Sequence, residues 1–245
     1  MRKRLAALVI AGAAATVGCA GAAGATSGAS HGQSAPHTVS LAAGGRDQAT
    51  LAVVSGSATV TVTAATMPGR LLRASTPAHS GIRPDLVESA GRVRLFLGGV
   101  AGHQGSGPSA VTVQLNSAIT WQLQFSGGAS QTILDLGTGK VAGIDFTAGS
   151  SLIRMVLPRP AGTAAIMLAG GASQVSMTVP AGVPARLQLA GGASTASLAG
   201  LTHVGVAGGT VLTGRGWAQA VRRYDVLAPA GVSDISVTND ISATG

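Results

Sequence analysis

The chain has few charged residues, almost no aromatic residues and a single cysteine. Charged residues make up 10% of its 245 residues, and aromatic residues make up 2%. Long surface helices need Glu, Lys and Arg along their outer faces, so this scarcity disfavours them. Residues 217–223 are the best helical candidate, and they would form only one or two turns. The 37 glycines instead favour flat β-structure in which small side chains pack close to the backbone.

The single cysteine, Cys19, excludes an intrachain disulfide, so packing must stabilise the fold. It also leaves no cysteine partner for a structural zinc site. The five histidines never approach metal-ligand spacing. We therefore expect neither a metal nor another cofactor.

Basic residues outnumber acidic residues by 16 to 8, which gives a net charge of +8. Three of the bases, Arg2, Lys3 and Arg4, lie at the N-terminus, and the others are dispersed with few aromatic residues between them. Nucleic-acid-binding proteins gather basic residues into a patch or along one face, so we expect no nucleic-acid partner. Arg greatly outnumbers Lys, and Ala and Gly are abundant, which indicates a GC-rich genome such as that of an actinobacterium.

The N-terminus has the layout of an export signal. Basic residues 2–4 precede an apolar run over residues 5–17, and Gly18 and Cys19 follow. This run is too short to span a bilayer and predicts a signal peptide over residues 1–18. The segment resembles a bacterial lipoprotein signal, which implies that Cys19 becomes a lipidated N-terminus at the outer face of the cell membrane. Ordinary secretion, with cleavage near residues 20–25, is the alternative.

The remaining chain divides by composition into three parts. Residues 19–36 are rich in Gly, Ala and Ser, which predicts a flexible tether. Residues 37–120 alternate apolar and polar side chains and predict an N-terminal β-region, continuous with a β-repeat region over residues 121–245. Pro and Gly divide the first region with loops at 67–89 and 98–109, where we look first for a partner contact. The strands expected before the repeats are 38–41, 51–54, 59–63, 92–97, 111–115 and 120–125.

A short Gly-rich phrase recurs four times, at residues 127–130, 148–151, 170–173 and 191–194. Counted from the second residue of each phrase, the steps are 21, 22 and 21 residues. A repeat of this length is one supersecondary unit that must stack on its neighbours to bury a core. Its glycines suit a tight corner that a Cβ would obstruct, and they supply positive φ. The cadence continues at Gly209 and Gly231, so we expect an all-β stack, a β-solenoid of short strands, that runs almost to the C-terminus.

The repeats carry a family resemblance. The segment 121–125 is followed by the Gly-Gly-Ala units, and Pro-containing turns at 157–160 and 179–184 separate their strands. Over about residues 90–240 this arrangement resembles the toast-rack β-repeat domains of bacterial envelope proteins. Such domains occur as adhesin-like domains and in membrane-associated regulators of cell-envelope stress. The resemblance implies the fold and a place at the envelope, and it implies no catalytic residue.

Motifs that could carry catalysis lack the structural context that they need. Residues 28–32 match the Gly-x-Ser-x-Gly nucleophile pattern but lie in the tether, with no strand before them and no helix after them. Residues 137–142 match a loose dinucleotide-binding pattern, but a strand follows where a helix is required, so we expect a β-turn. Asp135 and Asp145 could form a glycosidase pair, yet strand alternation points both outward. We therefore expect no enzymatic activity.

Three aromatic residues, Trp121, Trp217 and Tyr224, could contact a ligand. The tryptophans suit the core or the caps of the stack better, although surface aromatics are what a glycan-binding module needs. The leading hypothesis is an exported, lipid-anchored structural or interaction protein of the cell envelope, whose partner is an envelope protein or cell-wall glycan. A cell-envelope sensor or a carbohydrate-binding module is the alternative.

Overall fold

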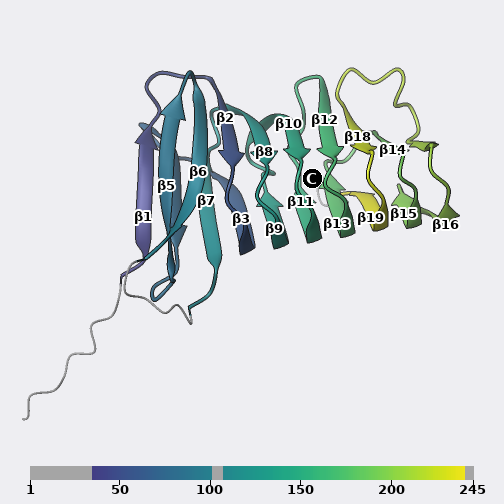
Figure 1. Ribbon diagram of the computed structural model, residues 1–245. Helices are drawn as coiled ribbons and strands as arrows, with labels where there is room; N and C mark the ends of the chain where they lie inside the picture. Colours follow the sequence, from purple (N-terminus) through teal and green to yellow (C-terminus); the bar gives the residue numbers. More distant parts are fainter. Residues whose placement is uncertain (1–34, 101–106, 241–245) are drawn as a thin grey trace, which may run out of the picture. The chain divides into compact units, whose positions relative to one another are not determined.

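The computed structural model describes residues 35–100 and 107–240, and these residues form 19 β-strands in two sheets (Figure 1). None of the described residues is helical. The predicted all-β stack of short strands is therefore confirmed. Cys19 and the predicted signal peptide lie outside the described residues. None of the described segments is a helix with the length and hydropathy needed to cross a membrane.

The strands are divided between a ten-stranded sheet, called sheet A, and a nine-stranded sheet, called sheet B. In spatial order, sheet A contains β1 (His37–Ala42), β4 (Arg70–Thr76), β7 (Ala110–Asn116), β3 (Ser57–Ala65), β9 (Ala129–Asp135), β11 (Ser150–Val156), β13 (Ala172–Val179), β19 (Val232–Asn239), β15 (Ala193–Leu198) and β16 (Leu201–Val206). Sheet B contains β17 (Thr210–Thr213), β14 (Ala185–Leu189), β18 (Arg223–Ala228), β12 (Thr163–Leu168), β10 (Lys140–Phe146), β8 (Thr120–Phe125), β2 (Gln48–Val53), β6 (Arg92–Gly99) and β5 (Ile82–Ser89).

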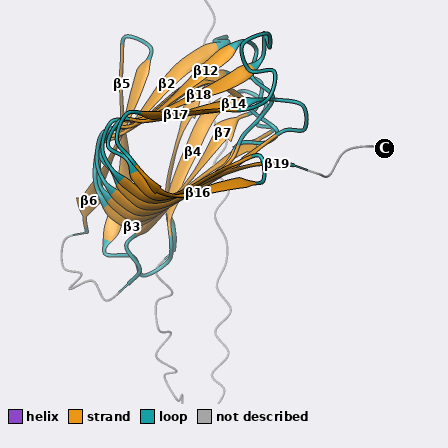
Figure 2. Cartoon of the chain, turned by 90° about the vertical axis from the view of Figure 1, so that its right-hand side faces the viewer, coloured by secondary structure: helices purple, strands orange, loops and turns teal. Residues whose placement is uncertain are grey.

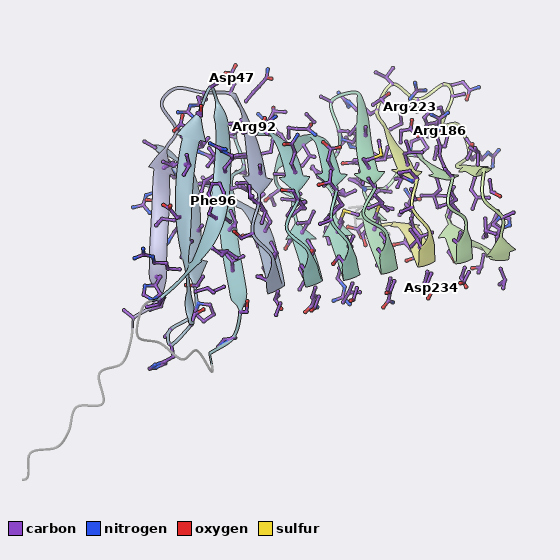
Figure 3. The ribbon with its side chains drawn as sticks, viewed as in Figure 1. Asp47, Arg92, Phe96, Arg186, Arg223 and Asp234 are labelled. Atoms are coloured by element: carbon purple, nitrogen blue, oxygen red, sulfur yellow. The ribbon has the colours of Figure 1, made fainter. Side chains whose placement is uncertain are left out.

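One rung of the stack consists of a strand of sheet B, a connection and the following strand of the chain, which belongs to sheet A. Figure 2, which looks along the stack, shows the two sheets as separate layers joined by loops at their sides. Neighbouring rungs pair in parallel in both sheets, as β8 does with β10 and β9 with β11. Alternate side chains face the space between the sheets, where Phe125 stacks on Phe146 of the next rung with ring centroids 4.7 Å apart. The intervening side chains face solvent, as Asp234 does on β19 (Figure 3).

The rungs do not stack in the order in which they occur in the chain. The last rung, β18–β19, lies between β12–β13 and β14–β15. Val232 of β19 is consequently the parallel partner of Ala172 on one side and of Ala193 on the other. At the other end, the early rung β2–β3 lies between β6–β7 and β8–β9. The last rung of the chain and an early one are thus both built into the interior of the sheets, whereas the first strand, β1, lies at the edge of sheet A.

The recurring Gly-rich phrase forms the corner between a sheet B strand and the sheet A strand that follows it. Six of these corners have three residues, and the third is always Gly. In spatial order, the middle residues are Ser55, Gly127, Ala148, Gly170, Ala230 and Gly191. Residues with and without a Cβ therefore alternate along the stack.

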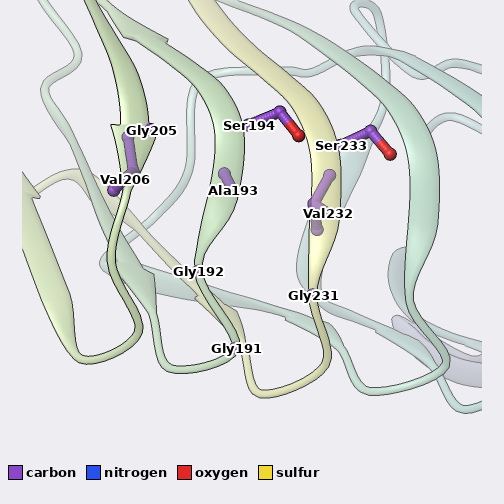
Figure 4. A pocket seen from close by; sticks show the side chains of 9 residues that line it. All are labelled: Gly191, Gly192, Ala193, Ser194, Gly205, Val206, Gly231, Val232 and Ser233. Atoms are coloured by element: carbon purple, nitrogen blue, oxygen red, sulfur yellow. The ribbon is translucent and has the colours of Figure 1, made fainter.

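Close approach of the backbones explains this alternation. A Cβ on Gly170 would overlap the backbone of Ala148, and a Cβ on Gly191 would overlap the backbone of Ala230. Figure 4 shows the adjacent corners at Gly191 and Gly231 side by side. Positive φ is a secondary cause, since among the third corner residues only Gly171 and Gly192 have it, at 72° and 77°.

The loop predicted at residues 67–89 is wrong, and the helical candidate at residues 217–223 is not a helix. Residues 67–89 do not form one loop, because they contain strands β4 and β5. Pro84, one of the residues that indicated a loop, lies in β5 at the edge of sheet B. Its partner Leu97 directs its N–H to Ser55 Oγ and not to β5, so the N–H that Pro84 lacks costs no ladder hydrogen bond. The helical candidate at residues 217–223 forms turns and bends instead, and Arg223 already begins β18, in agreement with the predicted all-β fold.

Candidate functional site

Two of the three aromatic candidates are enclosed by the core. Trp121 is 2% exposed, and its Nε1 donates a hydrogen bond to the carbonyl of Asn116 at 3.0 Å. Tyr224 is fully buried, and its hydroxyl donates to the carbonyl of Pro158 at 2.6 Å. This burial raises the pKa of Tyr224 above its usual range. Neither ring is therefore available for a ligand to stack on.

The two acids considered as a glycosidase pair lie on different sheets. Asp135 ends β9 in sheet A, whereas Asp145 lies in β10 of sheet B and accepts a hydrogen bond from Gln122 Nε2 at 3.0 Å. Each alternates with inward-facing apolar residues, so the two carboxylates face opposite sides of the stack. The segment at Gly139 is a turn, closed by its N–H and the carbonyl of Leu136 at 2.8 Å. Within residues 35–100 and 107–240, no group of His, Cys, Asp and Glu is arranged to hold a metal.

Polar side chains converge on the outer face of sheet B around strands β14 and β18, where Figure 3 labels Arg186 and Arg223. Arg186 donates two hydrogen bonds to Asp225, from Nε to Oδ1 at 3.0 Å and from Nη2 to Oδ2 at 2.6 Å. Gln188 Nε2 donates to Asp225 Oδ1 at 2.8 Å. The guanidinium carbons of Arg186 and Arg223 lie 3.8 and 4.1 Å from the centroid of the Trp217 ring. We call these five residues the Arg–Trp cluster.

The Arg–Trp cluster fastens the chain where it crosses from the edge of sheet B into its interior. Residues 214–222 lead from edge strand β17 to β18, which lies beyond β14. Trp217 Nε1 donates to the carbonyl of Tyr224 at 2.8 Å, and Arg223 Nη1 donates to the carbonyl of Trp217 at 3.0 Å. Arg223 also reaches the neighbouring strand β12, where its Nε donates to Thr163 Oγ1 at 2.9 Å. These contacts tie β12, β14, β18 and the crossing segment together.

Electrostatics favour the charged forms inside the cluster. The hydrogen bonds from Arg186 lower the pKa of Asp225, with partial burial opposing the shift and Gln188 adding to it. The same ion pair raises the pKa of Arg186. Because the guanidinium, carboxylate and ring contacts are made within the cluster, its arrangement suits a structural clamp better than catalysis. Sequence reasoning missed this cluster, although Arg186, Gln188, Arg223 and Asp225 alternate with apolar residues on their strands.

Exposed apolar side chains mark the same end of the stack. Among the described residues, the most exposed large apolar side chains are Val204 at 81%, Val221 at 79%, Leu201 at 69% and Val211 at 52%. Leu201 and Val204 belong to β16, Val211 belongs to β17, and Val221 lies in the crossing segment.

Comparison with known proteins gives one informative likeness. No protein-family model and no curated protein matches the chain. A solved structure described as a "putative cell adhesion protein" from Clostridium sporogenes matches with a TM-score of 0.62 and 14% identity, over 84% of this chain and 99% of that chain. The two chains share a fold. A "putative adhesin" from Bacteroides fragilis matches with a TM-score of 0.26 and 10% identity, over 84% of this chain and 97% of that chain.

Proposed function

We propose that this chain is an exported, lipid-anchored protein of the bacterial cell envelope that acts by contact and not by catalysis. Its fold likeness to the C. sporogenes protein, which spans 99% of that chain, is the observation that carries this proposal. The arrangement of candidate acids supports it, since Asp135 and Asp145 lie on opposite sheets. A rigid stack of rungs offers long faces on which side chains can be displayed to a partner.

The N-terminal sequence supports the anchoring part of the proposal. A basic segment, a short apolar run and Cys19 follow one another in the order of a lipoprotein signal. The Gly-, Ala- and Ser-rich residues 20–36 would then tether the stack to the membrane through the lipid on Cys19. The first strand begins directly after this segment, at His37. An envelope protein, a class that includes a second copy of this chain, is the partner that we favour, because the accessible apolar residues gather at one end of the stack.

No observation favours a glycan-binding module over a protein-binding one. Trp121 and Tyr224 are buried, and the ring of Trp217 is contacted by two guanidinium groups. A sugar platform needs an open aromatic face.

Lipid anchoring predicts that radiolabelled palmitate is incorporated into the wild-type protein in its native host. The labelled protein is expected in the membrane fraction and accessible to a membrane-impermeant biotin reagent, because the lipid on Cys19 would hold it at the outer face. The Cys19→Ala variant should lose the label and leave the membrane fraction, whereas Ser30→Ala in the tether should behave as wild type. Unlabelled wild-type protein in the culture medium would reject the anchor but retain export. Wild-type protein confined to the cytoplasm would reject both.

A further inference from the structure

The two ends of the stack differ in how their edge strands are protected. At one end, edge strand β5 carries the exposed charges Arg83, Asp85 and Glu88, and it contains Pro84. Strand β1, the edge of sheet A at this end, contacts β5 of sheet B. The ion pair between Arg46 and Glu88, at 2.5 Å, fastens the segment after β1 onto β5. Charge, proline and contact between the two edges are devices that prevent edge-to-edge pairing.

The edge strands at the other end carry neither charge nor proline. Edge strands β16 and β17 contain no Lys, Arg, Asp or Glu. Within residues 35–100 and 107–240, each pairs with only one neighbouring strand, β16 with β15 and β17 with β14, so its other side is a sheet edge with backbone N–H and C=O groups available for pairing. Val204 and Val211 are exposed on these two strands.

The apolar core is also less completely covered at this end. Leu201 is the register partner of Leu198, so its side chain lies on the same, inward face of sheet A. Leu198 is 7% exposed, whereas Leu201 is 69% exposed. Val206 and Leu212 pack against the core but are only half-buried. A further rung placed against β16 and β17 would cover these side chains.

We propose that a second copy of this chain supplies that cover, through antiparallel pairing of β16 with β16 of the second copy. A two-fold axis between the copies makes the paired edges antiparallel and continues the ladder in which β15 and β16 are already antiparallel. Like ends meet without opposing charges, because neither edge strand carries any. In a head-to-tail arrangement, this end of one copy would instead meet the end of the next copy that carries β5, with its charges and Pro84. Such contacts would repeat from copy to copy and would not form a closed assembly. The expected assembly is therefore an end-to-end dimer and not a filament.

This proposal does not depend on export or lipid anchoring, and it is tested on the full chain carrying Cys19→Ser. In that background neither a lipid nor an intermolecular disulfide can link two copies. Sedimentation equilibrium should give twice the chain mass. Val204→Lys should raise the dimer dissociation constant at least about 100-fold, because two like charges would face each other in the new ladder. Val156→Lys, on the outer face of interior strand β11 where the native side chain is 37% exposed, is the matched control and should leave the dimer intact.

Circular dichroism would show whether each variant is folded. If Val204→Lys misfolds, Val211→Lys on β17 takes its place and should also weaken the dimer. A wild-type chain that stays monomeric at every soluble concentration would overturn the proposal. So would a dimer that survives Val204→Lys or Val211→Lys, a dimer equally weakened by Val156→Lys, or growth into larger assemblies. A monomer that gains mass only when a different envelope protein is added would also reject the dimer.

Discussion

Removal of residues 223–245 is expected to unfold the stack and not merely to shorten it. This segment contains β18 and β19, which separate the β12–β13 rung from the β14–β15 rung. Its large buried side chains are Tyr224, Val226, Val232, Ile235 and Val237, each at most 4% exposed. Burying one such side chain contributes about 1.5–3 kcal/mol, so their combined loss is comparable with the whole stability of a domain, about 5–15 kcal/mol. The truncated chain should therefore lose its cooperative unfolding transition in urea, monitored by circular dichroism.

A chain that ends at Asp240 is the control for this truncation. It keeps both strands of the inserted rung and should unfold as the full chain does. In a repeat protein whose final unit lies at the end of the stack, terminal truncation leaves the other units folded. A truncated chain with a wild-type-like transition would therefore contradict the interior position of the last rung.

Gly170→Ala is expected to lower the free energy of unfolding by about 3 kcal/mol, the upper part of the range for overpacking a tight site. The new Cβ would overlap the backbone of Ala148 in the neighbouring corner, where no flexible side chain can move aside. Gly170 does not have positive φ, so the cost comes from this steric overlap and not from backbone strain. Urea unfolding of the variant and the wild type measures the difference.

Gly162→Ala is the matched control for the corner substitution. A Cβ at Gly162 would have no atom within 4 Å, and Gly162 also lacks positive φ. Its effect on the free energy of unfolding should stay within about 0.5 kcal/mol. Equal effects of the two substitutions would show that the corners are not packed as closely as the stack requires.

Strands were predictable where alternation was undisturbed. The segment at residues 120–125 was predicted with the same bounds that β8 has, because polar and apolar residues alternate without a break. Strands β4 and β5 were missed because Pro68, Gly69 and Pro84 were interpreted as loop signals. Pro84 is accommodated at a sheet edge, and edge position depends on tertiary structure that local sequence does not contain.

The order of the rungs was not apparent from the repeat, because each unit has nearly the same length and phrase. A signal was nevertheless present in the middle corner residues. In chain order Gly170 and Gly191 are consecutive members of this series, whereas in space Ala230 lies between them and restores the alternation with Cβ-bearing residues. The Arg–Trp cluster was unpredictable for the same reason, since Arg186 and Asp225 become neighbours only when β18 is inserted beside β14.

Disulfide formation between engineered cysteines tests the inserted rung most directly. In a Cys19→Ser background, cysteines at Gln174 and Asp234 occupy partner positions on β13 and β19, about 4.8 Å apart as in adjacent strands and within disulfide range. Cysteines at Gln174 and Thr195 are separated by the intervening strand β19, which puts them about 9.6 Å apart and too far to bridge. We expect mild oxidation to link 174 with 234 and not 174 with 195. Linkage of 174 with 195 but not with 234 would instead show that β13 and β15 are direct neighbours and contradict the inserted rung.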